Sequence, residues 1–392
     1  MAKTIPLSPK TILVRAPNWI GDQVIAYPFF FYLRRAFPEA RIVSACVPWV
    51  RDLQFRDLVD EVIVIQPPQS SWLIGKFWQL GVKGSAVAKL GPWDLGFSLP
   101  NSFSAAWFLY RAGVKVRVGY SVDGRGVLLN HRLVWDSNPA RHRAQAFVDL
   151  LPSEVRPKRP AREFFGVPPE NDLDEGTLGE VGAFPAPTSW CIEKAPLAPP
   201  KGGAGSETDR YYILAPGATA ESRRWDLENF KALARRVSAE RGWTGVVVGG
   251  PKEEAMGREL QETAGAKICN YVGRASIPEL QVLFKSAEFT ICNESGLAHV
   301  ASLCGSPVQI VCGAADPRRT RPLGPGRVEV AINPVECWPC ERNVCLQPLD
   351  KRVQCLRGIH VDRVWESIQN GLLGNPPKAS HGHEHRESGQ IT

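Results

Sequence analysis

The chain has 392 residues, of which 44 % are hydrophobic, and its formal net charge is +7 at pH 7. This length exceeds that of a usual domain with a single hydrophobic core and predicts two globular α/β domains. The longest aromatic-rich run, VIAYPFFFYL, is too short to cross a bilayer, and the first ten residues lack the apolar core of a signal peptide. We therefore expect a cytoplasmic protein without a transmembrane helix, whose ten cysteines are thiols or metal ligands rather than disulfides.

Short β-rich runs alternate with helical patterns from the N-terminus onwards, which predicts parallel βαβ units. The first predicted strand, TILVRA, leads into a helix that we expect from Asp22 to Phe37. Further strands are predicted over 40–47, 61–66, 93–100 and 114–120, with a helix over 102–112. From about residue 167 to residue 209, Pro, Gly and acidic residues replace this pattern and predict a linker with an insertion.

The alternation resumes in the second half, where a helix begins near Asp226, whose carboxylate can cap it, and ends before Gly242. Strands are predicted over 211–217, 244–250, 266–272, 288–292 and 307–313, with helices between them. The chain is thus divided into an N-terminal domain (1–175), a linker (176–209), a C-terminal domain (210–373) and a polar, disordered tail (374–392).

Basic residues crowd the first half of the chain, including the run RPKRPAR. Such a surface attracts polyanions, which include nucleic acid, anionic lipid and phosphorylated sugars, although it can also be only solvated surface. No helix-turn-helix or aromatic RNA-binding signature accompanies the charge, so we expect no nucleic-acid partner.

The loop RAPNWIGD lies at the carboxyl end of the first predicted strand, where α/β proteins collect ligands. It contains a single glycine and therefore lacks the G-x-G-x-x-G turn of a dinucleotide site. Asp22 would repel a diphosphate there and can accept a proton from a hydroxyl group. The local pattern leaves open the alternative that Asp22 only caps its helix.

The corresponding loop of the second half, APGATAESRRW, combines a glycine, hydroxyl groups and two arginines beside a helix N-terminus. These groups suit a pyrophosphate, although the loop can also be an ordinary polar one with exposed arginines. The candidate residues are Gly217, Thr219, Ser222, Arg223 and Arg224.

The run CNESGLAHVASLCG offers a second part of a nucleotide site. Glu294 can accept two ribose hydroxyls, while Ser295 and Gly296 allow backbone N–H groups to approach a phosphate. His299 completes the candidate donor-binding residues of this run, although Glu294 can instead be an N-cap and His299 a packing residue. Between the two runs, VVVGGPKEE supplies Gly249 and Gly250, against which a flat base can lie, although paired glycines also form ordinary turns.

Four cysteines near the C-terminus, Cys337, Cys340, Cys345 and Cys355, follow the spacing C-x2-C-x4-C-x9-C. Four thiolates with a close first pair suit tetrahedral zinc or iron, and free thiols or disulfides are the alternatives. No histidine or carboxylate joins the set as a catalytic metal would require, so we expect a structural metal and no organic cofactor.

Together these motifs resemble glycosyltransferase family 9, the heptosyltransferases of lipopolysaccharide core assembly, and most nearly its type II enzymes. The resemblance covers about residues 10 to 373. It is carried by APNWIGD, LPNSF, GYSVDGRGVLLN, LAPGATAESRRW, and NESGLAHVA followed by GSP.

The resemblance implies the GT-B fold, with an acceptor-binding N-terminal domain and a C-terminal domain that binds the nucleotide sugar. It implies transfer of heptose from ADP-L-glycero-D-manno-heptose to the heptosyl-Kdo inner core, with inversion at the anomeric carbon. Asp22 takes the place of the general base, Arg223 that of a phosphate-binding lysine, and Glu294 that of a ribose-binding aspartate. The cysteine cluster resembles one that binds iron in a subset of the family.

Acceptor contacts are expected from Trp19, Asn101 and Arg125 in the basic first domain, together with a salt-sensitive, peripheral contact with the inner face of the membrane. Two residues differ from the family pattern. Arg223 in place of lysine makes a forked contact, and Glu294 in place of aspartate reaches one methylene further. These differences leave the identity of the donor sugar open. Two other functions stay open: a transferase of the same fold that modifies protein with heptose, and a non-catalytic sensor of nucleotide or metal.

Overall fold

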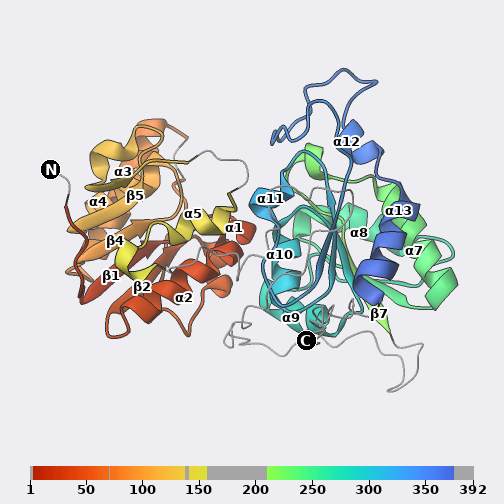
Figure 1. Ribbon diagram of the computed structural model, residues 1–392, viewed down its shortest axis with the longest axis horizontal. Coiled ribbons are helices and arrows are strands. Elements are labelled where there is room, and N and C mark those ends of the chain that lie inside the picture. Colours follow the sequence, from red (N-terminus) through yellow and green to blue (C-terminus); the bar gives the residue numbers. More distant parts are fainter. Residues whose placement is uncertain (1–2, 70, 137–140, 157–209, 375–392) are drawn as a thin grey trace, which may run out of the picture.

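A computed structural model describes residues 3–69, 71–136, 141–156 and 210–374, which form two α/β domains side by side (Figure 1). The predicted linker 176–209 and, beyond Gly374, the predicted tail lie outside these residues. Within the described ranges no helix combines the length and the apolar character needed to span a bilayer.

The first domain contains a six-stranded parallel sheet in the order β3-β2-β1-β4-β5-β6. Its strands are β1 (Thr11–Arg15), β2 (Arg41–Cys46), β3 (Glu61–Val64), β4 (Leu95–Ser98), β5 (Val116–Tyr120) and β6 (His131–Leu133). The strand order reverses between β1 and β4, whose register pairs Arg15 with Ser98. In doubly wound sheets the crevice at this reversal is where ligands bind.

Among the described residues, five helices and three short 3-10 turns surround this sheet. They are α1 (Ile20–Ile25), α2 (Tyr27–Ala36), α3 (Leu73–Ala88), α4 (Phe103–Arg111), α5 (Arg143–Val148), η1 (Pro48–Leu53), η2 (Arg125–Leu128) and η3 (Ser153–Val155). The single helix expected over 22–37 is wrong, because the chain forms α1 and α2 with Ala26 between them. Pro28 has no N–H with which to extend the hydrogen-bond ladder of α1, and it lies instead in the first turn of α2, which begins at Tyr27.

The second domain repeats this topology with the order β12-β11-β10-β7-β8-β9. Its strands are β7 (Tyr211–Ala215), β8 (Thr244–Val247), β9 (Ile268–Asn270), β10 (Thr290–Asn293), β11 (Val308–Cys312) and β12 (Val328–Ile332). Its helices are α7 (Leu227–Arg241), α8 (Glu254–Gln261), α9 (Ile277–Ser286), α10 (Gly296–Leu303), α11 (Pro317–Thr320), α12 (Gln354–Arg357) and α13 (Val361–Ser367), with the short turns η5 (Glu221–Arg223) and η6 (Pro251–Glu253) and the π-helical η7 (Ile368–Leu373).

Helix α7 forms as its sequence predicts. The carboxylate of Asp226 accepts the backbone N–H of Glu228 at 3.0 Å, and Gly242 ends the helix with φ 69°. Phe230, Leu233 and neighbouring apolar residues are buried against the sheet. Such a cap contributes about 1 kcal/mol, and only glycine reaches positive φ without a steric cost.

The two domains touch where α1 of the first meets α10 of the second. A Cβ on Gly21 would lie 2.9 Å from His299 Cδ2, and a Cβ on Gly296 would lie 2.8 Å from Ile20 Cβ. Glycine at each helix start therefore allows the other helix to approach closely. This contact places the loop after β1 beside the loop after β10.

Candidate functional site

The candidate site lies between the domains, at the carboxyl ends of the central strands of both sheets. Asp22 follows β1, Arg223 follows β7 and Glu294 follows β10. These three strands flank the points at which the strand order reverses, which is where doubly wound folds bind ligands. The fold thus brings three of the predicted site residues to one interface.

Asp22 does not cap its helix. The N-cap of α1 is Trp19, whose side chain makes no capping hydrogen bond, and Asp22 lies in the first turn. Its Oδ1 instead accepts a hydrogen bond from Arg143 Nη1 at 2.8 Å, and its side chain is 22 % exposed. The carboxylate is thus held by a cation at the interface and remains in reach of a substrate.

Arg143, the first residue of α5, was not singled out by the sequence. Burial lowers the pKa of its guanidinium, but Asp22 and, beyond it, Glu341 and Glu294 more than offset this effect, so the net pKa is raised. The residue is one arginine among several in a basic run, and its partner lies 121 positions away. Only the fold could connect the two.

In the second domain Arg223 Nη1 lies 2.9 Å from Glu294 Oε2, and the Glu294 side chain is only 11 % exposed. Burial raises the pKa of Glu294, while Arg223, Arg143 and a hydrogen bond with Thr320 oppose the rise. Asp22 is close enough to raise it further. Two carboxylates and two guanidiniums thus form one charge network across the interface: Asp22, Arg143, Glu294 and Arg223.

Several buried polar atoms beside this network have no protein hydrogen-bond partner within the described part of the chain. They are Arg223 Nε, Ser295 Oγ and His299 Nδ1. Buried polar groups are almost always paired, so these atoms are natural contacts for a polar ligand. Burial, reinforced by His142 and Arg143, lowers the pKa of His299 to about 3, which makes its imidazole neutral at neutral pH.

The predicted phosphate loop after β7 exposes some of its candidate residues and buries another. Thr219 and Arg224 are exposed, and Arg224 Nε donates to the carbonyl of Ala218 at 2.7 Å. Ser222 is different, because it is buried and its hydroxyl donates to the carbonyl of Arg342. The expectation that Ser222 contacts a donor is therefore wrong in this arrangement: its side chain fastens the cysteine-bearing segment to the loop.

A carboxylate that the sequence did not identify lies beside Gly249 and Gly250, the glycines expected to receive a base, and beside Gly217 of the predicted phosphate loop. A Cβ on Gly217 or on Gly249 would collide with the carboxyl group of Glu253, which also accepts the N–H of Gly250 at 2.7 Å. Burial raises the pKa of Glu253, with opposing effects of the Gly250 N–H and Arg224. The sequence shows Glu253 only as part of a helix start.

The three residues expected to contact an acceptor lie in different surroundings. Trp19 is 64 % exposed, as a contact with an acceptor requires, whereas Arg125 is fully buried. Its guanidinium donates to the Tyr120 carbonyl, to Ser98 Oγ and, at 2.8 Å, to Asn101 Oδ1. Direct contact between Arg125 and an acceptor is therefore wrong in this arrangement; Arg125 positions Asn101, which remains partly exposed.

A cavity of about 410 Å³ adjoins the loop after β1. Its lining includes Arg15, Asn18 and Trp49 together with Phe77 and Phe103, so it is largely apolar with a few polar groups. Arg15 Nη2 donates to Asn18 Oδ1 at 2.6 Å, and Trp49 Nε1 donates to the Asn18 carbonyl at 2.6 Å. These bonds fix the loop that carries Trp19 and leads into the helix that carries Asp22.

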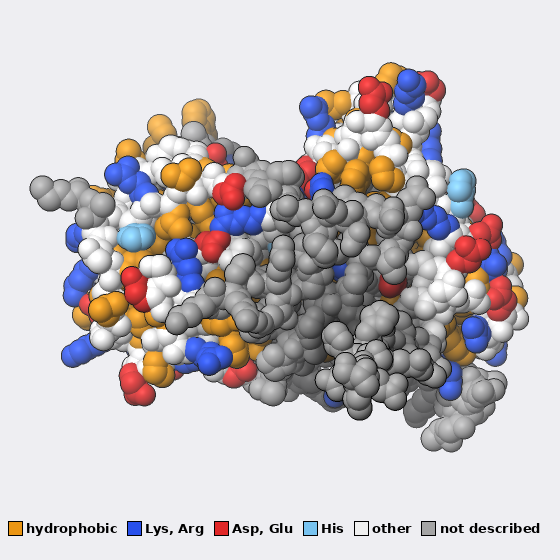
Figure 2. Space-filling view, in the orientation of Figure 1, with side chains coloured by type: hydrophobic (Ala, Val, Ile, Leu, Met, Phe, Trp, Pro, Cys, Tyr) orange, Lys and Arg blue, Asp and Glu red, His pale blue; other side chains and the backbone are white. Residues whose placement is uncertain are grey.

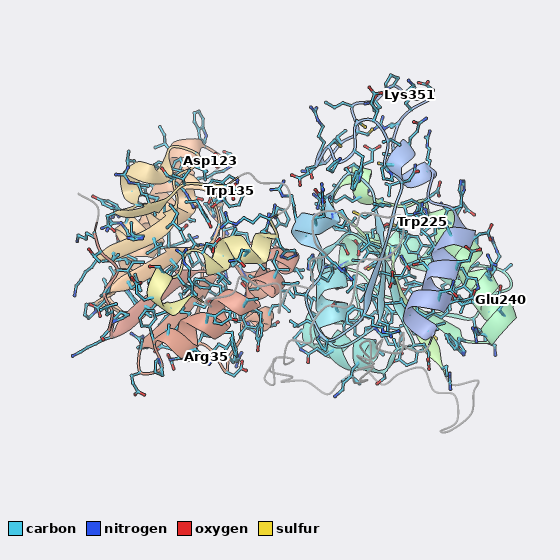
Figure 3. The ribbon with its side chains drawn as sticks, in the orientation of Figure 1. Arg35, Asp123, Trp135, Trp225, Glu240 and Lys351 are labelled. Carbon is cyan, nitrogen blue, oxygen red and sulfur yellow. The ribbon has the colours of Figure 1, made fainter. Side chains whose placement is uncertain are left out.

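The cysteine-bearing segment, residues 337–355, includes a loop around Lys351 that projects from the second domain (Figure 3). All four cysteines are free thiols; Cys337 is exposed and Cys355 is buried. Burial and the other three thiols raise the pKa of Cys355. Over the residues that the structure describes, no three Cys, His, Asp or Glu side chains are arranged to hold a metal ion. Zinc or iron here stays a prediction of the spacing, which metal analysis of the purified protein would test.

The chain is similar in sequence and fold to known proteins. The model of glycosyltransferase family 9 (heptosyltransferase) matches residues 89–349. Lipopolysaccharide heptosyltransferase 2 of Escherichia coli K12 is 25 % identical over 327 residues, which cover 80 % of this chain and 85 % of that protein. The solved E. coli ADP-heptose lipopolysaccharide heptosyltransferase II has a TM-score of 0.65 at 20 % identity and covers 93 % of this chain and 98 % of its own. A family 9 glycosyltransferase of Veillonella parvula has a TM-score of 0.67 at 18 % identity and covers 94 % and 98 %.

Proposed function

Because the chain belongs to glycosyltransferase family 9 and has two Rossmann-like domains of the GT-B type, we propose that it transfers heptose from ADP-L-glycero-D-manno-heptose to the heptosyl-Kdo inner core of lipopolysaccharide. The observation that carries the proposal is the charge network at the interface. An acid from the first domain and a cation from the second belong to this network, which supports a site where an acceptor hydroxyl meets a donor diphosphate.

In the proposed reaction, an acceptor hydroxyl oxygen attacks the anomeric carbon of the donor and inverts it. Asp22 accepts the hydroxyl proton, and since Arg143 is bonded to Oδ1, Oδ2 is the oxygen that takes it. The bond between the anomeric carbon and the diphosphate oxygen breaks, and ADP leaves with the bonding electron pair. Arg223, Arg224 and Thr219 stabilise the charge that develops on the diphosphate.

In this proposal the nucleotide binds to the second domain, at the edge of its sheet. Glu253 is the carboxylate beside Gly217 and Gly249, so it is placed to accept ribose hydroxyls when a nucleotide enters. Glu294 pairs with Arg223 and faces the first domain, which suits a role near the phosphates and the sugar. We therefore move the ribose contact from Glu294 to Glu253.

The decisive experiment incubates purified protein with ADP-heptose and truncated core acceptors and identifies the product by mass spectrometry. Asp22→Asn should bind ADP normally and lower kcat by roughly 10²- to 10⁴-fold, the usual contribution of a general base. The matched control is Asp52→Asn in the same domain, whose carboxylate is 43 % exposed and pairs with its neighbour Arg51. Transfer by Asp22→Asn at the wild-type rate would exclude Asp22 as the base.

The same assay separates the alternatives. Glycosylation of a protein, with no product on the core acceptors, would indicate a protein heptosyltransferase, and ADP binding without any transfer would indicate a sensor. Since the proposed acceptor is a glycolipid, we also propose that the protein works in the cytoplasm in peripheral contact with the inner membrane.

A further inference from the structure

Helix α3 presents large apolar side chains to solvent. Ile74, Trp78 and Val82 are 84 %, 71 % and 48 % exposed, and Trp72, just before the helix, is 80 % exposed. Residues spaced by four share one side of a helix, so these three form a stripe. Figure 2 shows orange side chains projecting at the top of the first domain, where Figure 1 places α3. A surface helix ordinarily carries polar residues on this side.

The stripe cannot turn inward, because the adjoining side of α3 is fitted against α4. A Cβ on Gly84 would lie 2.7 Å from Arg111 Cβ, and a Cβ on Gly81 would lie 3.2 Å from Trp107 Nε1. Trp107 Nε1 also donates to the carbonyl of Phe77 at 3.0 Å. The two glycines thus fix which side faces the domain, and the apolar stripe is the side left outward.

The charged side chains of the segment that carries this stripe have one sign. From residue 62 to residue 93 the sequence contains Lys76, Lys83 and Lys89 and no acidic residue. An outward apolar stripe with tryptophan and flanking lysines is the pattern of a helix that lies in the interface of an anionic bilayer. A protein partner would need no such uniform positive charge.

We propose that α3 docks the first domain onto an anionic lipid bilayer, with Ile74, Trp78 and Val82 at the level of the headgroups and the exposed Lys76 and Lys89 against the phosphates. Lys76, Phe77 and Leu80 of the same helix line the cavity beside the loop after β1. Docking therefore brings this cavity to the lipid surface. The inference depends on the proposed function only in that the acceptor is a glycolipid.

Vesicle flotation tests the docking without any substrate. The full chain should float with vesicles of phosphatidylcholine mixed with phosphatidylglycerol, far less with phosphatidylcholine alone, and less as salt rises. Ile74→Ser/Trp78→Ser should weaken binding at least about tenfold, since two exposed apolar side chains lose their transfer into the interface. The control is Val127→Ser/Val134→Ser, an exposed pair in the same domain (81 % and 88 %), which should bind like wild type.

Three results would overturn the proposal: equal binding by wild type and Ile74→Ser/Trp78→Ser, equal losses in the two double variants, or a wild-type dimer in sedimentation that Ile74→Ser/Trp78→Ser dissociates. Activity separates this proposal from the proposed function. Ile74→Ser/Trp78→Ser should keep wild-type rates on a deacylated, water-soluble core acceptor and lose rate only on an acceptor embedded in vesicles. Absence of heptose transfer by wild type would refute the proposed function and leave the flotation result standing.

Discussion

Replacing Arg143 by glutamine removes the cation that is bonded to the proposed base. Arg143 Nη1 lies 2.8 Å from Asp22 Oδ1, and the two side chains are 39 % and 22 % exposed. Two unit charges about 4 Å apart attract by about 4 kcal/mol at the effective dielectric near a protein surface. At this exposure, solvent and salt should reduce the attraction to about 1–2 kcal/mol. If this attraction is what holds the Asp22 carboxylate in its productive position, its loss lowers kcat/KM roughly five- to thirtyfold.

The assay measures initial rates of ADP release with a soluble core acceptor. The matched control is Arg34→Gln, because Arg34 Nη2 pairs with Asp60 Oδ2 at 2.7 Å in the same domain but away from the interface. We expect Arg34→Gln to transfer at the wild-type rate, and Arg143→Lys, which keeps the charge without the forked contact, to lose less than Arg143→Gln. An unchanged rate in Arg143→Gln, or equal losses in it and Arg34→Gln, would refute the assignment.

Three further predictions concern acidic and imidazole groups. Glu253→Ala should weaken ADP binding about tenfold by calorimetry, whereas the exposed neighbour change Glu254→Ala should not; equal affinities would exclude the ribose contact. Burial already raises the pKa of Glu294, and a diphosphate that draws Arg223 away should raise this pKa further. ADP binding should therefore take up protons, and calorimetry should show a binding enthalpy that depends on the buffer. Burial lowers the pKa of His142 to about 4 from 6.5, so the unfolded state binds more protons between these values, and the free energy of unfolding should fall by up to about 3 kcal/mol as pH drops through this window. Denaturant titrations in which His142→Asn keeps the full pH slope would contradict this.

The parts of the fold that the sequence predicted depend on local signals. The second domain shows this well, since Asp226 and Gly242 carry the chemistry of a helix start and end, and α7 occupies the residues between them. Alternating strands and helices admit few topologies, so two parallel sheets could be anticipated. Asp22, Arg223 and Glu294 could be chosen because strand ends at the centre of such sheets converge on one edge.

The parts that the sequence missed depend on contacts between distant residues. Helix α3 has no clear polar side, because its glycines pack inward while Ile74 and Trp78 point outward, so periodicity could not reveal it. Ser222 had every attribute of a phosphate contact except orientation, which is set by the carbonyl of Arg342, 120 positions away. Arg125 likewise looked available because its burial arises from Ser98 and Asn101 on another loop.

The partition of charges between the domains explains how the proposed site can open and close. Asp22 and Arg143 both belong to the first domain, and Arg223 and Glu294 both belong to the second. Each domain therefore carries an acid paired with its own arginine, and separating the domains leaves no buried charge without a partner, a situation that costs about 3–5 kcal/mol when it arises. If Asp22 were paired directly with Arg223, closing the domains would neutralise the proposed base and the phosphate-binding cation against each other. In the proposed reaction the first acts on the acceptor and the second on the donor. The internal pairs keep them apart while Arg143 and Glu294 remain near enough to attract across the interface.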